Sequence, residues 1–295
     1  MDNSLAGWLR LREPADATAR SSNLTDMIAD ELMSTDPVHV LDLATGTGAN
    51  LRYLTAHLPV HQRWLVVDRN SALLAHIPAL TSEWGAAQQC DVRSDPAGCI
   101  IRGKQLECHV EIRRLNLKTL CNTDIFLGRH LVTASALLDL VSEKWLAALA
   151  DRCRAVGAAV LFTITYTGQS VCSPMEPEDD MICNLLNQHQ KTDKGLGGPA
   201  AGPDAAQCAA RCFAAVGYRV RTAPSNWRLG PSDQELQRQL IAGWAEVASH
   251  VAPGDVSHID NWRDRRFSHI DANRSHVVVS HLDIAAWLPH DVSSQ

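Results

Sequence analysis

A glycine-rich turn between an apolar run and an amphipathic segment is the part of the sequence best suited to chemistry. It lies in LDLATGTGANLRYL at residues 41–54, where Gly46 and Gly48 follow the apolar run. Glycines let a ligand approach the backbone, and the start of a helix presents unpaired N–H groups. Asp68 ends the next apolar run, 20 positions after Gly48. A carboxylate there can accept hydrogen bonds from both hydroxyls of a ribose, so the spacing predicts a nucleoside site.

Two other nucleotide sites fit this turn less well. The dinucleotide fingerprint G-x-G-x-x-G/A needs a small residue where Leu51 stands, because the helix must pack closely on the strand. NAD is therefore disfavoured, although an NAD-dependent oxidoreductase stays as an alternative. The chain contains no G-x-x-x-x-G-K-[ST] sequence, which argues against a phosphate-cradling ATPase.

Strand-like and helix-like segments alternate around the turn. Short apolar runs predict strands at 38–43, 64–68, 130–134, 158–164, 218–222 and 275–284. Apolar residues at helical spacing predict helices at 16–33, 49–58, 71–77, 142–152, 177–190, 204–216, 232–250 and 260–272. This alternation is typical of an α/β protein whose parallel sheet is covered by helices on both faces.

We expect a single domain over residues 1–295, because no linker divides the chain. Its first part, residues 1–35, is predicted to form an N-terminal helical cap. Residues 85–112 are predicted to be an inserted β-hairpin, since IIRGKQLECHV places a glycine-containing turn between two β-prone runs. Two further segments, 167–203 and 230–272, are predicted to be lid or substrate insertions.

Composition limits the classes of partner. The chain has 27 Lys and Arg against 33 Asp and Glu, a net charge of −6, and no dense basic run, which argues against a nucleic-acid partner. The N-terminus lacks a signal-peptide pattern and no segment approaches the ~18 apolar residues of a membrane span, so we expect a cytoplasmic protein without a membrane partner. Nine cysteines without a CxxC pair predict neither a metal site nor a disulfide framework.

The turn and the following apolar run together resemble a known family. LDLATGTGAN and WLVVD are similar to motifs I and II of the class I S-adenosylmethionine-dependent methyltransferases, whose first motif reads approximately acid-x-Gly-x-Gly-x-Gly. Asp42 matches the acid, and Ala44 stands where many members have the first glycine. The resemblance covers roughly residues 36–165. It implies a Rossmann-like, seven-stranded, mostly parallel sheet of order 3-2-1-4-5-7-6 with the seventh strand antiparallel, S-adenosylmethionine as cofactor and S-adenosylhomocysteine as product.

The resemblance also implies roles for single residues. Asp42 would support the methionine amino group, Asp68 would hold the ribose, and Asn116 in RRLNL would contact adenine in place of the usual acid. Arg20 of the N-terminal helix could meet a carboxylate of the cofactor or the substrate. The predicted cofactor-binding residues are Asp42, Ala44, Thr45, Gly46, Gly48, Asn50, Asp68, Arg69, Asn116, Leu117, Ala134, Ser135 and Arg20.

Three residues are candidates for handling the proton of an acceptor. His189 is the first candidate for a general base, because an imidazole titrates near neutral pH, but it shares a helical stripe with apolar residues and could instead pack inward. Tyr166, directly after the fifth strand, could donate a hydrogen bond to the acceptor or cap the sheet. Asp139 follows the fourth strand and is expected near the cofactor, or hydrogen-bonded within the cleft wall.

The acceptor is predicted mainly by exclusion. The chain has no Asn/Asp-Pro-Pro-aromatic run of the kind that holds a nucleobase nitrogen in similar enzymes, and its net charge is acidic. Large segments beside the cleft suggest an enclosed site for a small molecule. The hypothesis is methylation of a small molecule on oxygen or nitrogen, and a non-catalytic S-adenosylmethionine-binding protein is the third alternative.

Overall fold

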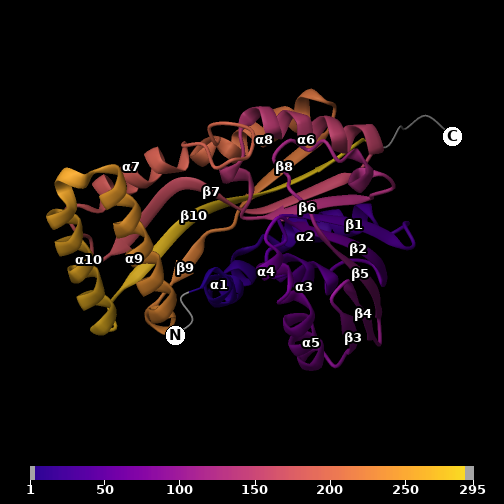
Figure 1. Ribbon diagram of the computed structural model, residues 1–295, viewed down its shortest axis with the longest axis horizontal. Coiled ribbons are helices and arrows are strands. Elements are labelled where there is room, and N and C mark those ends of the chain that lie inside the picture. The colour runs from indigo at the N-terminus through magenta and orange to yellow at the C-terminus, as the bar shows by residue number, and fades with distance from the viewer. Residues whose placement is uncertain (1–3, 290–295) are drawn as a thin grey trace.

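A mixed sheet runs through the part of the chain that the structure describes, residues 4–289 of a computed structural model (Figure 1). Its parallel part contains, in spatial order, β5 (Leu106–Arg114), β2 (His61–Asp68), β1 (Val38–Leu43), β6 (Leu131–Ser135) and β7 (Ala159–Ser173). The middle strands are apolar on both faces because helices cover both sides. Residues 1–3 and 290–295 of the predicted ranges 1–35 and 1–295 lie outside the described residues.

The last strand of the chain completes the sheet in the opposite direction. β10 (His276–Trp287) pairs antiparallel with β7 on one side and with β8 (Arg219–Pro224) on the other. Numbered in chain order, the seven strands β1, β2, β5, β6, β7, β8 and β10 therefore have the order 3-2-1-4-5-7-6 with the seventh antiparallel. The predicted α/β fold class is confirmed, within a sheet that has ten strands in the described residues.

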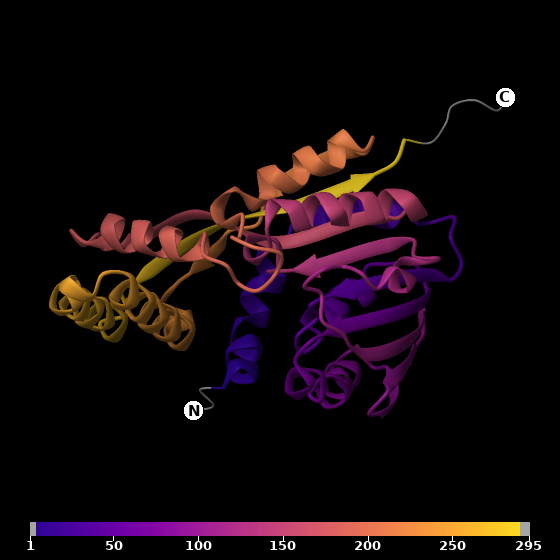
Figure 2. The same cartoon turned by 45° about the horizontal axis from the view of Figure 1, so that its top comes forward.

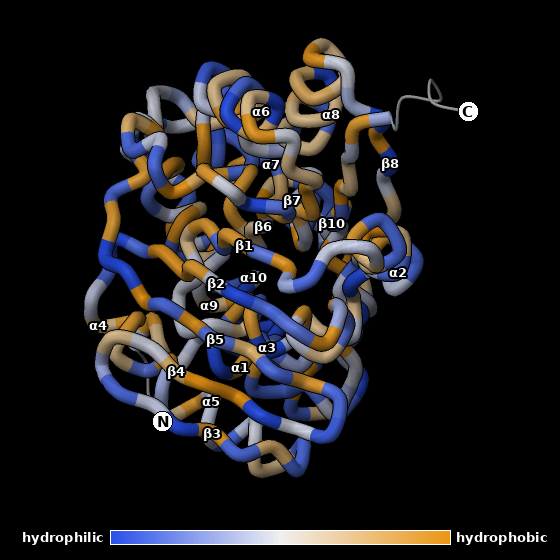
Figure 3. The backbone as a smooth tube through the Cα atoms, turned by 90° about the vertical axis from the view of Figure 1, so that its right-hand side faces the viewer, coloured by the Kyte–Doolittle hydropathy of each residue, from blue (hydrophilic) through white to orange (hydrophobic). Residues whose placement is uncertain are grey.

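The predicted hairpin differs from the observed one in its limits. β4 (Gly98–Gly103) and β5 do form a hairpin, but β5 is the third strand of the core sheet, so the segment 85–112 is not a separate insertion. Residues 85–87 end α5 (Ile77–Ala87), and only β3 (Asp91–Asp95) and β4 extend the sheet beyond β5. Figure 3 shows that apolar residues concentrate along the central strands, while the edge strand β3 is mostly hydrophilic.

Helices bury one apolar core on each face of the sheet. On one face lie α2 (Ser22–Glu31), α3 (Ala49–Thr55), α4 (Ser71–Leu74) and α5. On the other lie α6 (Glu143–Val156) and α8 (Ala205–Ala215). The single helix predicted at 16–33 is instead α2 and a preceding α1 (Leu5–Ala19), because Arg20 leaves the helical conformation and the side chain of Ser21 caps α2 by accepting from the N–H of Leu24.

A second group of elements extends to one side of the sheet (Figures 1 and 2). We call it the outer lobe: the outer parts of β7 and β10, with β9 (Trp227–Leu229), α7 (Asp179–Gln190), α9 (Gln234–Val251) and α10 (Val256–Asp271). The strand predicted at 158–164 continues to Ser173, so the first residues of the predicted lid 167–203 belong to β7. Buried Arg266 of α10 forms an ion pair with Asp179 of α7, which ties the helices of the lobe together.

Candidate functional site

The turn after β1 has the backbone geometry that its glycines predict. Gly46 and Gly48 have φ values of +58° and +83°, and Gly48 is the N-cap of α3. Ala44 also has a positive φ, +53°, in a position where glycine is the usual residue. The turn, residues 44–48, therefore leads the chain from the carboxyl end of β1 into a helix start.

Buried Asp42 stabilises this turn through two side-chain hydrogen bonds. Its Oδ2 accepts a hydrogen bond from Thr45 Oγ1 at 2.5 Å and its Oδ1 accepts one from Asn50 Nδ2 at 2.7 Å. Burial raises the pKa of Asp42 to about 6, against the opposing effect of these two bonds. Because both oxygens bind the chain itself, Asp42 fixes Asn50 and Thr45 in place. Its support of a methionine amino group, which the family resemblance implies, stays a prediction.

Arg20, the C-cap of α1, contacts Asn50 as well. Its guanidinium donates to Asn50 Oδ1 at 2.6 Å and to Ser135 Oγ at 3.2 Å, and it lies 4.4 Å from the centre of the Tyr53 ring. The third donor, Nε, is buried and has no hydrogen-bond partner among the described residues. Burial lowers the pKa of Arg20, and the largest opposing effect is the charge of Asp16. A cation with an unused donor therefore lies beside the turn, joining two residues predicted to bind cofactor.

Asp68 meets the turn from the neighbouring strand. Its Oδ2 accepts from the N–H of Gly46 at 2.9 Å, and its Oδ1 accepts from the N–H of Asn70 at 2.8 Å. Each carboxylate oxygen retains a second lone pair, so the side chain can still accept from ligand hydroxyls. Arg69 beside it is exposed, and the loop at Gly195 approaches the Arg69 guanidinium.

Three predicted cofactor residues do not take part in the hydrogen bonds of the turn. Leu117 is buried in the core, and its carbonyl accepts from Trp145 Nε1 at 2.7 Å. Ala134 is also buried in that core. Asn116 is exposed and its side chain accepts from the N–H of Lys118 at 2.9 Å, so its amide already has a local partner.

Helix α1 covers the turn from outside. A Cβ placed on Gly46 would lie 3.1 Å from Leu9 Cδ1, which makes Gly46 a close-approach position. Glu13 of α1 forms an ion pair with buried Arg52 of α3 at 2.6 Å, and Arg52 also donates to the carbonyl of Thr47 at 2.8 Å. The helix that closes over the turn is thus fixed to it by charge and by packing.

A cavity of about 500 Å³ lies on the other side of α1, between the sheet and the outer lobe. We call it the aromatic pocket. The three predicted catalytic residues Asp139, Tyr166 and His189 all line it, although they come from separate elements. Apolar and aromatic walls are formed by Trp8, Leu186, Trp227, Leu240, Trp244 and Val279. Arg20 connects the turn with this pocket. It donates to Asn50 beside the turn and to Ser135, and the residue after Ser135, Ala136, lines the pocket.

The polar groups of the pocket differ in their hydrogen-bond partners within the chain and in the direction of their pKa shifts. Burial raises the pKa of Asp139 to about 6, and Gln190 Nε2 lies 3.5 Å from its Oδ2. Tyr166 donates to Asn187 Oδ1 at 3.1 Å, and burial raises its pKa. Partial burial and the charge of Lys194 lower the pKa of His189. Above pH 6 the pocket therefore contains an ionised carboxylate beside neutral rings.

Several residues of this pocket were not predicted from the sequence. Trp8, Trp227, Trp244 and His281 are contributed by α1, β9, α9 and β10, and none belongs to a local motif. The one available signal is the excess of Trp, with 8 against 4 Phe and 3 Tyr. Only the fold brings these rings together.

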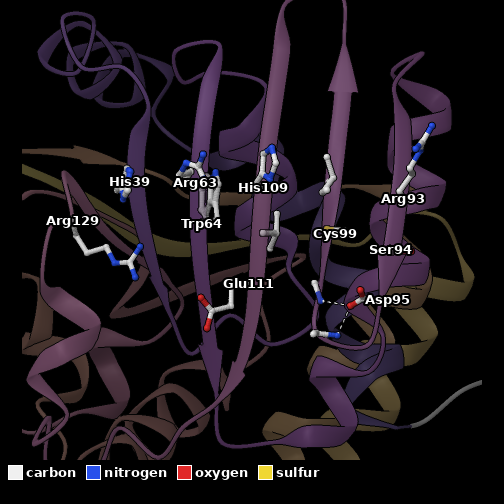
Figure 4. Close-up of a pocket in the computed structure, with 14 residues that line it drawn as sticks. His39, Arg63, Trp64, Arg93, Ser94, Asp95, Cys99, His109, Glu111 and Arg129 are labelled. Carbon is white, nitrogen blue, oxygen red and sulfur yellow. Dashed lines mark hydrogen bonds between the residues drawn. The ribbon is translucent and has the colours of Figure 1, made fainter.

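A second hollow, of about 640 Å³, lies on the open face of the sheet over β1, β2, β5, β4 and β3 (Figure 4). His39, Arg63, His109 and Arg93 project there from register-aligned strands. Two of its charged side chains pair with neighbours, Arg93 with Asp91 and Glu111 with Arg113, and its walls lack the aromatic rings of the first cavity apart from Trp64 and two histidines. We therefore place the candidate site at the turn and the aromatic pocket.

No protein-family model and no curated protein matches the sequence. Several solved structures are similar in fold. The cyclopropane synthase MmaA2 from Mycobacterium tuberculosis is 13% identical, with a TM-score of 0.46 and coverage of 96% of this chain and 95% of that one. A SAM-dependent methyltransferase from Geobacter sulfurreducens, solved with S-adenosylhomocysteine, is 11% identical, with a TM-score of 0.44 and coverage of 95% and 98%.

A geranyl diphosphate methyltransferase solved with SAM is 10% identical, with a TM-score of 0.43 and coverage of 98% and 93%. Within residues 4–289, no helix is long and apolar enough to cross a membrane. The same residues contain no group of three or more His, Cys, Asp or Glu side chains placed to hold a metal ion.

Proposed function

We propose that the chain is a methyltransferase that transfers the methyl group of S-adenosylmethionine to a small molecule held in the aromatic pocket. The observation that carries the proposal is the meeting of the glycine turn with Asp68 at adjoining strand ends, in a sheet whose seventh strand is antiparallel. A ligand at the carboxyl ends of the strands would lie where the strand order reverses around β1.

The residues present fit this cofactor. Gly46 and Gly48 supply the positive φ values of the turn without adding side chains to it, and the Asp68 carboxylate is suited to the two hydroxyls of a ribose. The unpaired Nε of Arg20 and the unpaired hydroxyl of Thr47 are buried donors that a methionine carboxylate would satisfy. Asn116 and Arg69 would border the adenine, while Leu117 and Ala134 would shape the floor from the core.

S-adenosylmethionine supplies an electrophilic methyl group, so the protein must place the acceptor in line with it and take up the acceptor's proton. We assign the proton to Asp139, because this residue follows β6 closely and its carboxylate is buried and ionised above pH 6. S-adenosylmethionine would supply the methyl group, and Asp139 would take the proton that the acceptor atom loses. Tyr166 and His189 would position the acceptor.

An NAD-dependent oxidoreductase is less well supported. Leu51 is fully buried in the core between α3 and the sheet, where a dinucleotide fold would place a small residue. The antiparallel strand β10 between β7 and β8 also differs from the parallel order 3-2-1-4-5-6 of dinucleotide-binding sheets.

Calorimetric titration with S-adenosylhomocysteine, with NAD as the parallel ligand, tests the proposal first. We expect micromolar binding of S-adenosylhomocysteine alone, followed by transfer of a labelled methyl group to an acceptor. Binding of NAD alone, or of neither compound, would refute the cofactor assignment. Binding of S-adenosylhomocysteine without turnover on any acceptor would favour the non-catalytic alternative.

A further inference from the structure

The aromatic pocket is lined by one buried imidazole, that of His281. His281 on β10 is 6% exposed and lines the pocket, and its Nδ1 is buried with no hydrogen-bond partner among the described residues. An unsatisfied buried polar atom is costly, so this nitrogen calls for an explanation, and a ligand in the pocket supplies one. We propose that the acceptor is a planar aromatic compound with a hydroxyl group that donates a hydrogen bond to the His281 ring. This inference rests on the proposed function, because it specifies the acceptor of that site.

The ring of His281 is held in one orientation by its neighbours. Its centroid lies 5.3 Å from the Trp227 ring and 6.3 Å from the Tyr166 ring, and Tyr166 is its cross-strand partner in the sheet. The backbone N–H of His281 donates to Asn226 Oδ1 at 2.9 Å. A ring packed between two others cannot turn freely, so its nitrogens keep fixed directions toward a ligand.

The charge state of His281 makes the ring an acceptor. Burial lowers its pKa to about 4 and the positive charge of Arg12 lowers it further, while Asp16 and the backbone of Val279 oppose both effects. The neutral imidazole has one nitrogen that carries a lone pair and one that carries a hydrogen. Arg12 pairs with Asp16 at 2.9 Å, so the nearest cation is already neutralised and does not attract an anionic ligand into the pocket.

The walls of the pocket favour a flat ligand. Trp227 is immobilised, since its Nε1 donates to Asp16 Oδ1 at 2.9 Å, the Arg12 guanidinium lies 4.8 Å from its ring centre, and Trp8 meets it at 6.4 Å. Trp8 and Trp244 are only partly buried, so their ring surfaces are available to a ligand. Fixed aromatic rings gain more from stacking on another planar ring system than from an aliphatic chain. The cavity, at about 500 Å³, has room for two or three fused or linked rings.

The test uses three probe compounds with the full-length protein, titrated by calorimetry without cofactor. 7-Hydroxyflavone is planar and has a hydroxyl, flavone is the same molecule without it, and 1-decanol has a hydroxyl on an aliphatic chain. We expect 7-hydroxyflavone to bind roughly tenfold more tightly than flavone, the difference that one buried hydrogen bond confers. We expect 1-decanol to bind more weakly than 7-hydroxyflavone.

Variants test whether His281 causes the difference in affinity between 7-hydroxyflavone and flavone. His281→Phe keeps a ring and should reduce the ratio between the two flavones to about one, while His281→Gln retains an acceptor and should restore part of it. Trp244→Leu should weaken both flavones together by roughly fivefold to tenfold, because it removes a stacking surface. His258→Phe on the exposed side of α10 and Trp84→Leu on α5 are the matched controls, and should leave all three affinities unchanged.

The outcomes separate this inference from the proposed function. Equal binding of the two flavones, or an unchanged ratio in both folded His281 variants, would overturn the role of His281. Tighter binding of 1-decanol than of 7-hydroxyflavone would overturn the aromatic class. If the flavones bind as expected while S-adenosylhomocysteine does not bind, the pocket assignment stands and the methyl-transfer function fails. If S-adenosylhomocysteine binds and 7-hydroxyflavone does not, only the acceptor class fails.

Discussion

The glycine turn and the aromatic pocket, the two halves of the proposed site, are built in opposite ways. The turn gathers its carboxylates from residues 42–68, and its polar groups bind one another, as Asp42 does with Thr45 and Asn50. The pocket collects residues from α1, β7, α7, β9, α9 and β10, and it leaves His281 unsatisfied. A preorganised polar network suits the cofactor, which is the same in every turnover. An apolar cavity with few polar groups suits selection of one acceptor among similar molecules. Four substitutions test whether the two halves have these separate tasks.

The largest effect should come from Asp139→Asn in the pocket. If the carboxylate takes the proton, kcat should fall by about 100-fold or more at pH 7.5, which is the usual size of general-base catalysis. The wild-type rate should rise with pH through about 6, the raised pKa of Asp139, and the variant should lose this rise. Measuring kcat from pH 5 to 8 with a labelled methyl donor checks it, and affinity for S-adenosylhomocysteine should stay the same.

The same variant makes an opposite prediction for stability. The pKa of Asp139 is higher in the folded protein than in the unfolded chain, so protonation stabilises the fold at low pH and this contribution is lost as pH rises through about 6. The amide does not ionise. Asp139→Asn should therefore be more stable than wild type by about 1–2 kcal/mol at pH 8, with a smaller difference at pH 5. A less stable variant at pH 8 would contradict the buried-charge explanation.

In the turn, Asp68→Ala should weaken S-adenosylhomocysteine binding by about 100-fold, because two charge-assisted hydrogen bonds to ribose are lost. Calorimetry measures the affinity, and circular dichroism checks that the fold remains. Asp95→Ala, at the exposed edge of the sheet, is the control and should bind normally. Wild-type affinity in Asp68→Ala would remove the ribose assignment.

A smaller effect on the turn should come from Gly46→Ala. The new methyl group lies against Leu9 and the backbone has φ +58°, so we expect a loss of about 1–2 kcal/mol in stability and about tenfold in S-adenosylhomocysteine affinity. Gly157→Ala has φ +72° with open space around the added carbon. It should lose similar stability without losing affinity. Equal affinities in the two variants would show that α1 does not press on the cofactor site.

The smallest effect should come from His189→Ala. Its ring lines the pocket and burial lowers its pKa, so it contributes surface and a neutral hydrogen-bonding group at pH 7. We expect KM for the acceptor to rise about threefold to tenfold with kcat nearly unchanged. A large drop in kcat would instead make His189 the general base that the sequence favoured. Unchanged kcat and KM would exclude it from the reaction, and exposed His258→Ala is the reference for neutral substitution.

Prediction from the sequence was strongest where structure is local. The strand VHVLDL, the turn and the acid at position 68 follow one another closely, and the structure connects them through a hydrogen bond from Gly46 to Asp68. The strand order followed from the family resemblance and is present in the sheet. The predicted limits of the hairpin were wrong because β5 pairs with both β2 and β4. The same apolar pattern is typical of a hairpin strand and of a strand in the core sheet, so the sequence did not distinguish them.

The sequence by itself determined the glycine turn, the alternation of strands and helices, and the set of residues near β1, because these depend on backbone preferences and on periodicity over a few residues. Only the tertiary structure decided that Arg20 lies against Asn50 and Ser135, and that Trp8, Trp227, Trp244 and His281 share one cavity. Residues up to 273 positions apart, as Trp8 and His281 are, have no local pattern in common. Their meeting results from the long antiparallel strand β10, whose first part pairs with β9, and β9 in turn packs against α1.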